Sequence, residues 1–232
     1  MPEIYTTIVT AHIAAGAVAL LTYWIAALAR KGSPIHRAAG KLFLLAMLAI
    51  IVTSIPMTVW QFARGNPIGA AFLGFLVVLV SSACWSAWFA IRYKRQPACF
   101  YGRTQLVLGM ACLISGGAVS VLGFSVGSML LGLFGLIGVA VGVETWRAQR
   151  RDSHPANWWL REHYGAMIGN GVATHIAFLG IGLRGLLPGQ DWAVLQYGAW
   201  FGPVLVAIVA GIWLDRRYSR PRSATHTVRA HG

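Results

Sequence analysis

The sequence predicts an all-α polytopic membrane protein, built as one bundle of seven transmembrane helices with the N-terminus outside and the C-terminus in the cytoplasm. The first supporting observation is composition, because 57% of the 232 residues are hydrophobic and 11% are charged. The second is pattern: apolar segments of about 19 to 25 residues alternate with short loops, and at ~1.5 Å per residue each segment crosses a ~30 Å hydrocarbon core. The third is the placement of the positive charges on alternate loops.

The predicted spans follow one another with loops too short to hold a soluble domain. In chain order they cover residues 5–29, 41–62, 68–91, 103–124, 128–146, 164–187 and 193–214. We therefore expect a single membrane domain over residues 1–215. Residues 216–232 are basic and poor in apolar side chains, which is typical of a disordered cytoplasmic tail.

The lysines and arginines delimit these spans and indicate which face each loop occupies. Seventeen of the 19 lie after the first, third and fifth spans or in the tail, whereas Arg64 and Arg184 fall on the other face. The seventeen are Arg30, Lys31, Arg37 and Lys41, then Arg92, Lys94, Arg95 and Arg103, then Arg147, Arg150, Arg151 and Arg161, and finally Arg216, Arg217, Arg220, Arg222 and Arg229. By the positive-inside rule these regions are cytoplasmic, so the number of spans is odd and the N-terminus is outside.

The formal net charge of +13 would suggest nucleic-acid binding in a soluble protein. Here the charge is divided among loops at one membrane face, where it sets topology and meets anionic lipid. We therefore expect the lipid bilayer as a partner and no nucleic acid.

Glycines recur within the spans at intervals of three or four residues. They are Gly132, Gly135, Gly138 and Gly142 in the fifth span, Gly165 and Gly169 in the sixth, and Gly198 and Gly202 in the seventh. Small residues at this spacing let helix backbones approach closely. We expect them to serve packing inside the bundle, and a homodimer through the Gly-rich faces is the alternative.

A line of polar side chains in the sixth span is the first candidate site. His163, Met167, Asn170 and Thr174 follow one another at intervals of 4, 3 and 4 residues and so share one helix face. Hydrocarbon offers such groups no hydrogen-bond partners, so we expect this polar seam to face the bundle interior, beside Gln105 or Glu144.

Ionisable side chains gather at the cytoplasmic end of the predicted bundle. We place His36, Arg37 and Glu144 at about the depth of His163, near Gln105. A cluster of this kind can relay protons, hold an anionic headgroup, or ligate a metal or haem. The alternative is an interfacial network of helix caps and ion pairs.

Two further histidines lie deeper, His12 about 10 Å and His175 about 18 Å from the outer surface at ~1.5 Å per residue. As a pair of axial haem ligands they would be offset by about 8 Å along the membrane normal. A hydrogen-bonded structural role is the alternative for each.

Several chemistries are excluded because their residues are missing. The only lysines are Lys31, Lys41 and Lys94, so the seventh span has none to bind retinal. The chain has no His-Glu-x-x-His, no Gly-rich phosphate loop and no Cys-x-x-Cys pair. We assign no catalytic residue and no dedicated metal site.

Three elements give the chain a resemblance to a known family. They are His12-Ile13-x-x-Gly16, Lys31-Gly32-x-x-x-His36-Arg37-x-x-Gly40, and Trp159-Leu160-x-x-His163-x-x-x-Met167-x-Gly169. Over residues 10–215 the chain resembles a family of bacterial predicted membrane proteins catalogued as a domain of unknown function. The resemblance implies a multi-pass helical fold in the cytoplasmic (inner) membrane, and it brings no activity with it. A more distant analogy, to b-type transmembrane cytochromes, rests on histidines in helices.

Three functional classes follow from these observations. The histidines favour a haem- or quinone-binding redox module, the polar seam favours a small-solute or proton transporter, and the scarcity of intramembrane acids favours a non-catalytic membrane or assembly protein. We adopt the redox interpretation, with haem b as the candidate cofactor in the cytoplasmic half. The candidate cofactor-binding residues are His36, Arg37, His163, Glu144, His12 and His175, and the candidate seam residues are Met167, Asn170, Thr174 and Gln105.

Overall fold

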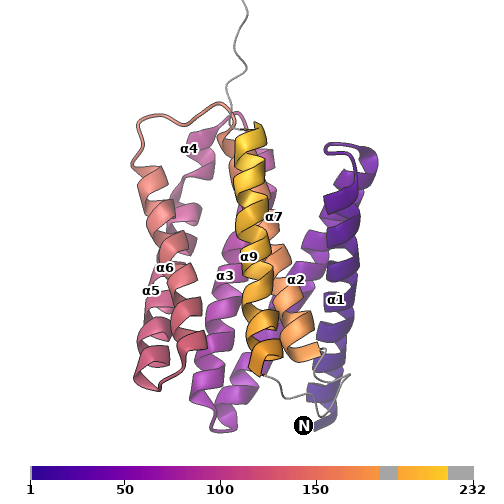
Figure 1. The fold of residues 1–232 in the computed structure, drawn as a ribbon, viewed down its shortest axis with the longest axis vertical. Coiled ribbons are helices and arrows are strands. Elements are labelled where there is room, and N and C mark those ends of the chain that lie inside the picture. The colour runs from indigo at the N-terminus through magenta and orange to yellow at the C-terminus, as the bar shows by residue number, and fades with distance from the viewer. Residues whose placement is uncertain (1, 183–192, 219–232) are drawn as a thin grey trace, which may run out of the picture.

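Seven long helices run along one common direction in the structure, a computed structural model that describes residues 2–182 and 193–218 (Figure 1). The elements are α1 (Pro2–Leu28), α2 (Pro34–Ala63), α3 (Pro67–Arg92), the short α4 (Pro97–Phe100), α5 (Arg103–Ser125), α6 (Met129–Gln149), α7 (Trp158–Ala177), the π-helical segment η1 (Phe178–Gly182) and α9 (Ala193–Tyr218). No strand occurs in these described ranges. The all-α prediction is therefore confirmed.

The bundle is organised around α3. This helix packs against α2, α5 and α7, and α9 packs against α7. The hairpins α1–α2 and α5–α6 lie on opposite sides of it, as Figure 1 shows in indigo-purple and pink. Since α7 lies between α3 and α9, a side chain on its inner face meets protein rather than lipid.

The turns before α2 and α3 explain where these helices begin. Each turn has a glycine, then a helix-capping residue, then proline: Gly32-Ser33-Pro34 and Gly65-Asn66-Pro67. The φ angles of Gly32 and Gly65 are 79° and 77°, a conformation in which glycine has no steric penalty. The side chain of Ser33 accepts a hydrogen bond from the His36 amide, and that of Asn66 accepts one from Gly69.

Several helix ends differ from the expected spans. The helix expected at 41–62 begins at Pro34, and the one expected at 164–187 begins at Trp158. In both cases the first turns carry polar or charged residues, His36 and Arg37 in α2 and Arg161 and Glu162 in α7, and for that reason the sequence was interpreted there as a loop. Residues 183–187 of the expected sixth span and 219–232 of the expected tail lie outside the described residues.

Helices α5 and α6 pack backbone to backbone through glycines. An added Cβ at Gly116 would lie 2.6 Å from the Gly135 carbonyl oxygen and 2.9 Å from Gly138 Cα. Ser120 joins the same interface by donating its hydroxyl to the Gly132 carbonyl at 2.9 Å. The glycines of α6 therefore serve packing within the chain.

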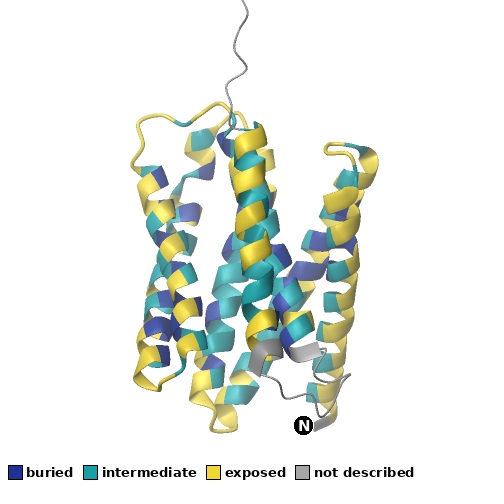
Figure 2. Cartoon of the chain, viewed as in Figure 1, coloured by how far each residue is buried: buried dark blue, intermediate teal, exposed yellow. Residues whose placement is uncertain are grey.

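Six of the described helices are long and apolar enough to cross a membrane, namely α1, α2, α3, α5, α6 and α9. Large apolar side chains such as Leu21, Leu45 and Val206 are more than 60% exposed on their outer faces, and Figure 2 shows exposed residues along the outside of the bundle. An exposed apolar surface of this extent needs a hydrocarbon solvent. Helix α7 is not among the six, because polar residues interrupt it.

Candidate functional site

The polar seam of α7 packs against α2 and α3. Asn170 is fully buried and Thr174 is buried. Cys84 of α3 donates its thiol to Asn170 Oδ1, with 3.6 Å between the two atoms, and Thr174 Oγ1 lies 3.5 Å from Met47 Sδ of α2. Met167, on the same face, packs against the buried cluster around Met47. The seam therefore lies inside the bundle at the junction of three helices.

His163 and His36 hold their rings in the same way at one end of the bundle. Nδ1 of His163 lies 2.8 Å from the Ala87 carbonyl oxygen of α3, and Nδ1 of His36 lies 2.9 Å from the Ala26 carbonyl oxygen of α1. A carbonyl oxygen only accepts, so Nδ1 of each ring carries the proton and Nε2 of the neutral ring keeps a lone pair. Within the described part of the chain no hydrogen bond reaches either Nε2.

The two imidazoles are also electrostatic neighbours. An electrostatic interaction links His163 to His36, and another links it to Lys31. The side chains come from α2, α7 and the turn between α1 and α2, which the fold therefore brings to one place.

The Lys-Gly-x-x-x-His element has a structural explanation in the α1–α2 turn. The Lys31 ammonium donates to the carbonyls of Ala26 and Ala27, and His36 donates to Ala26 as well. Both side chains thus satisfy carbonyls at the C-terminal end of α1 that have no intrahelical partner. Burial lowers the pKa of Lys31 below its ordinary value.

His12 and His175 are placed apart from this pair. His12 Nδ1 lies 2.9 Å from Thr53 Oγ1 and so joins α1 to α2. His175 uses both ring nitrogens, since Nδ1 donates to the Gly171 carbonyl and Nε2 accepts from Trp24 Nε1 at 2.9 Å. His175 has no lone pair left for a ligand.

The remaining candidates make other contacts, and no hydrogen bond between them and the two histidines occurs in the described residues. The Glu144 side chain is 61% exposed and pairs with Arg147 at 3.0 Å and with Arg151 at 4.0 Å. Arg37 is exposed on α2. Gln105, which we expected beside the seam, is buried between α5 and α3, where it pairs with Ser86.

A second polar group covers the same end of the bundle. Tyr101, in the turn before α5, donates its hydroxyl to the Glu162 carboxylate at 2.9 Å. The His154 ring stacks on the Tyr101 ring with centroids 4.1 Å apart. Burial, and then the Glu162 carboxylate, raises the pKa of Tyr101. Burial, and then the Arg151 charge, lowers the pKa of His154.

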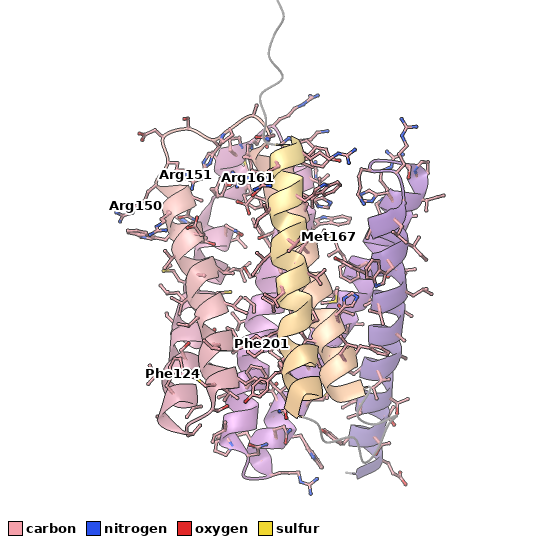
Figure 3. The ribbon with its side chains drawn as sticks, viewed as in Figure 1. Phe124, Arg150, Arg151, Arg161, Met167 and Phe201 are labelled. Carbon is pink, nitrogen blue, oxygen red and sulfur yellow. The ribbon has the colours of Figure 1, made fainter. Side chains whose placement is uncertain are left out.

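Asp215 fastens α9 to α7 at this end. Its carboxylate accepts hydrogen bonds from the Arg161 guanidinium at 3.2 and 3.5 Å and from the Tyr164 hydroxyl. Figure 3 shows Arg150, Arg151 and Arg161 at the same end of the bundle. This end is therefore the cationic one of the two faces that the loops occupy.

Sequence reasoning missed the partners of the seam. Met47 and Cys84 stand alone in apolar helices and carry no motif, so only their helical faces, matched to that of α7, could have pointed to them. Across residues 2–182 and 193–218, no three His, Cys, Asp or Glu side chains group in a way that would hold a metal ion.

No protein-family model, curated protein or solved structure matches the chain. Its class therefore follows from the fold. The six apolar helices, with their exposed outer faces, make it a multi-pass helical membrane protein in contact with the lipid bilayer.

Proposed function

We propose that the protein is a redox module of the membrane that binds a haem through His36 and His163, at the end of the bundle where the basic loops lie. One observation carries the proposal: each imidazole donates its Nδ1 proton to a main-chain carbonyl of a neighbouring helix, which leaves Nε2 as a free ligand atom. Histidines that bind metal ions share this arrangement, because the second hydrogen bond fixes the tautomer and orients the ring.

The surroundings of the pair suit a haem in two further ways. Gly40 follows His36 by one helical turn, and a side chain there would meet no atom within 4 Å, so the surface of α2 is open at this position. Lys31 and Arg37 place positive charge on the adjoining turn, where propionate groups need counter-charges. His36 and His163 would hold the haem through their Nε2 atoms, and a haem held by two histidines would supply electron transfer.

The test is the absorption spectrum of protein purified from haem-replete cells. We expect a Soret band in the wild type and its loss in His36→Asn and His163→Asn. Asparagine keeps a donor near the position of Nδ1, so it preserves the hydrogen bond to the carbonyl and removes only Nε2. His12→Asn and His175→Asn are the matched controls and should keep the band. Colourless protein that shows no spectral change on adding haem would refute the proposal. A quinone extracted from such protein would show that the redox cofactor is a quinone and not a haem.

The full topology belongs to the same proposal. It has seven spans, an outside N-terminus and a cytoplasmic C-terminus, in a bacterial inner membrane. The charge distribution of the loops supports the orientation. The seventh span is α7 with η1, since α7 packs against the apolar helices α3 and α9 and its polar residues are among those buried inside. A buried span need not be apolar, because protein supplies its partners.

The proposal also includes a homodimer, formed through helix faces that carry glycine. Glycines that could serve it include Gly165, Gly169, Gly198 and Gly202, each with no atom within 4 Å of an added Cβ.

A further inference from the structure

The turn between α3 and α4 encloses a cavity that is lined by cationic and hydrogen-bonding side chains. Its volume is about 570 Å³, and its lining residues are Arg92, Tyr93, Lys94, Arg95 and Gln96. This volume falls within the range of ~300–1,000 Å³ that is typical of ligand sites. Each of the five side chains can donate hydrogen bonds and none is acidic, so the cavity suits an anion.

Pro97 explains why the chain turns at this point. Proline disfavours helical geometry in the residue before it, and Gln96 accordingly has a φ of -135° and a ψ of 71°. The Gln96 amide then closes the turn by donating to the Tyr93 carbonyl at 2.7 Å. A continued helix would spread the three cationic side chains around its circumference, whereas the turn arranges them around one cavity.

The three cations of the cavity have no carboxylate partner. In the part of the chain that the structure describes, no ion pair and no side-chain hydrogen bond involves Arg92, Lys94 or Arg95. In the next basic loop, by contrast, two arginines pair with Glu144. The cavity therefore carries three positive charges for which the described residues supply no counter-charge.

Aromatic side chains lead from the apolar part of α3 to this cavity. Trp85, Phe89 and Tyr93 lie one turn apart on one helix face, and their rings stack in series with centroids 4.8 and 5.5 Å apart. All three are partly exposed. Trp88, which is 46% exposed, lies one turn before Arg92. A molecule bound in the cavity therefore also meets apolar surface that continues along α3.

The cavity lies at the level of lipid headgroups. Figure 1 shows α4, which follows the cavity in the chain, at the end of the bundle where Figure 3 shows Arg150, Arg151 and Arg161. Helix α3 is one of the six helices that are able to cross a membrane, and the lining of the cavity begins with its last residue. The end of a membrane-spanning helix lies where hydrocarbon gives way to headgroups, so the cavity is within reach of a lipid phosphate.

We infer that this cavity binds the phosphate headgroup of one anionic phospholipid, whose acyl chains lie along the aromatic side chains of α3. Guanidinium groups bind phosphate oxygens in pairs, and a lysine ammonium adds a point charge. The carbonyls at the C-terminal end of α3 carry about half a negative charge, which opposes an anion but is outweighed by three cations. Basic pockets at the cytoplasmic side of membrane helices bind headgroups of this kind. The inference is independent of the haem proposal, because it uses other side chains.

The test is the binding of a fluorescent short-chain phosphatidylglycerol to the full chain in neutral detergent, measured by fluorescence anisotropy. Phosphatidylcholine has the same phosphate but no net charge, so the wild type should bind it more weakly. The variant Arg92→Gln/Lys94→Gln/Arg95→Gln should bind phosphatidylglycerol on the order of 100-fold more weakly than the wild type, because each cation beside an anionic lipid contributes about fivefold in affinity.

The matched control is Arg30→Gln/Lys41→Gln/Arg216→Gln. It removes the same number of charges from the same end of the bundle, at exposed positions that do not line the cavity. It should bind phosphatidylglycerol as tightly as the wild type. Equal weakening in the two triple variants would show that the lipid responds to overall charge alone, and that result overturns the inference. Equal affinity of the wild type for the two lipids also overturns it.

Two further measurements keep the result decisive. A melting curve checks that the cavity variant folds, and if it does not, Lys94→Gln and Arg95→Gln replace it, each with an expected weakening of about fivefold. Inorganic phosphate and glycerol phosphate are added as competitors, and neither should displace the lipid at equal concentration. Displacement by glycerol phosphate at the concentration of the lipid would show that the cavity recognises a soluble phosphate, and the lipid assignment would be wrong.

Discussion

The α5–α6 interface gives the most quantitative prediction, through the two adjacent glycines Gly116 and Gly117. Gly116 faces α6, where an added Cβ would lie 2.6 Å from the Gly135 carbonyl oxygen and 2.9 Å from Val139 N. Gly117 faces away, and a Cβ there meets no atom within 4 Å. Ordinary contact begins near 3.4 Å, so Gly116→Ala must push two backbones apart by several tenths of an ångström, whereas Gly117→Ala moves nothing.

The magnitude follows from comparing the two variants. Alanine gains roughly 0.8–1 kcal/mol of helix propensity over glycine at either position, so this gain cancels. The remaining difference is the overpacking cost, about 1–3 kcal/mol, with Gly116→Ala the less stable. The assay is the free energy of unfolding in mixed detergent micelles, titrated with sodium dodecyl sulfate. Stabilities that agree within about 0.5 kcal/mol would show that α5 and α6 do not pack through these glycines.

Two further predictions concern the end of the bundle with the basic loops. Burial lowers the pKa of His154 below 6.5, so the folded protein disfavours the imidazolium. The stability that the neutral ring contributes is therefore present above pH 6.5 and is lost as the pH falls below that value. His154→Phe keeps a ring to stack on Tyr101 and removes the titration. Below pH 6.5 the melting temperature of the wild type should therefore fall relative to that of the variant. Melting temperatures of the two proteins that change in parallel with pH would contradict this. For the topology, a C-terminal reporter that is active only in the cytoplasm should be active, and activity of an outside-only reporter at that end would overturn the seven-span arrangement.

The long apolar helices were predictable because hydropathy acts over many residues at once. Their ends were not, because single turns decide them. Pro34 starts α2 after Ser33, and His36 then bonds back to Ala26 of α1. In the sequence this segment is simply polar, and it resembles a loop until its hydrogen bonds to the neighbouring helix are seen.

The site was predictable in part for a similar reason. The intervals of His163, Asn170 and Thr174 put them on one face, and that information is contained in one helix. Which helices cover the face depends on the packing of the whole bundle. For that reason Gln105 was expected at the seam. Cys84 and Met47, which contact Asn170 and Thr174 of the seam, could not be identified from the sequence.

Helix α7 shows why hydropathy and burial must be considered together in this protein. It carries Asn170 and Thr174 at positions that no lipid touches, and α3 and α9 cover it on two sides. A helix surrounded by other helices does not need an apolar sequence, and its polar side chains cost little only while partners from those helices meet them. Of the partners that α7 meets, the Ala87 carbonyl and the Cys84 thiol both belong to α3. The orientation of His163 therefore depends on the α3–α7 contact, and a substitution that separates these two helices should weaken haem binding.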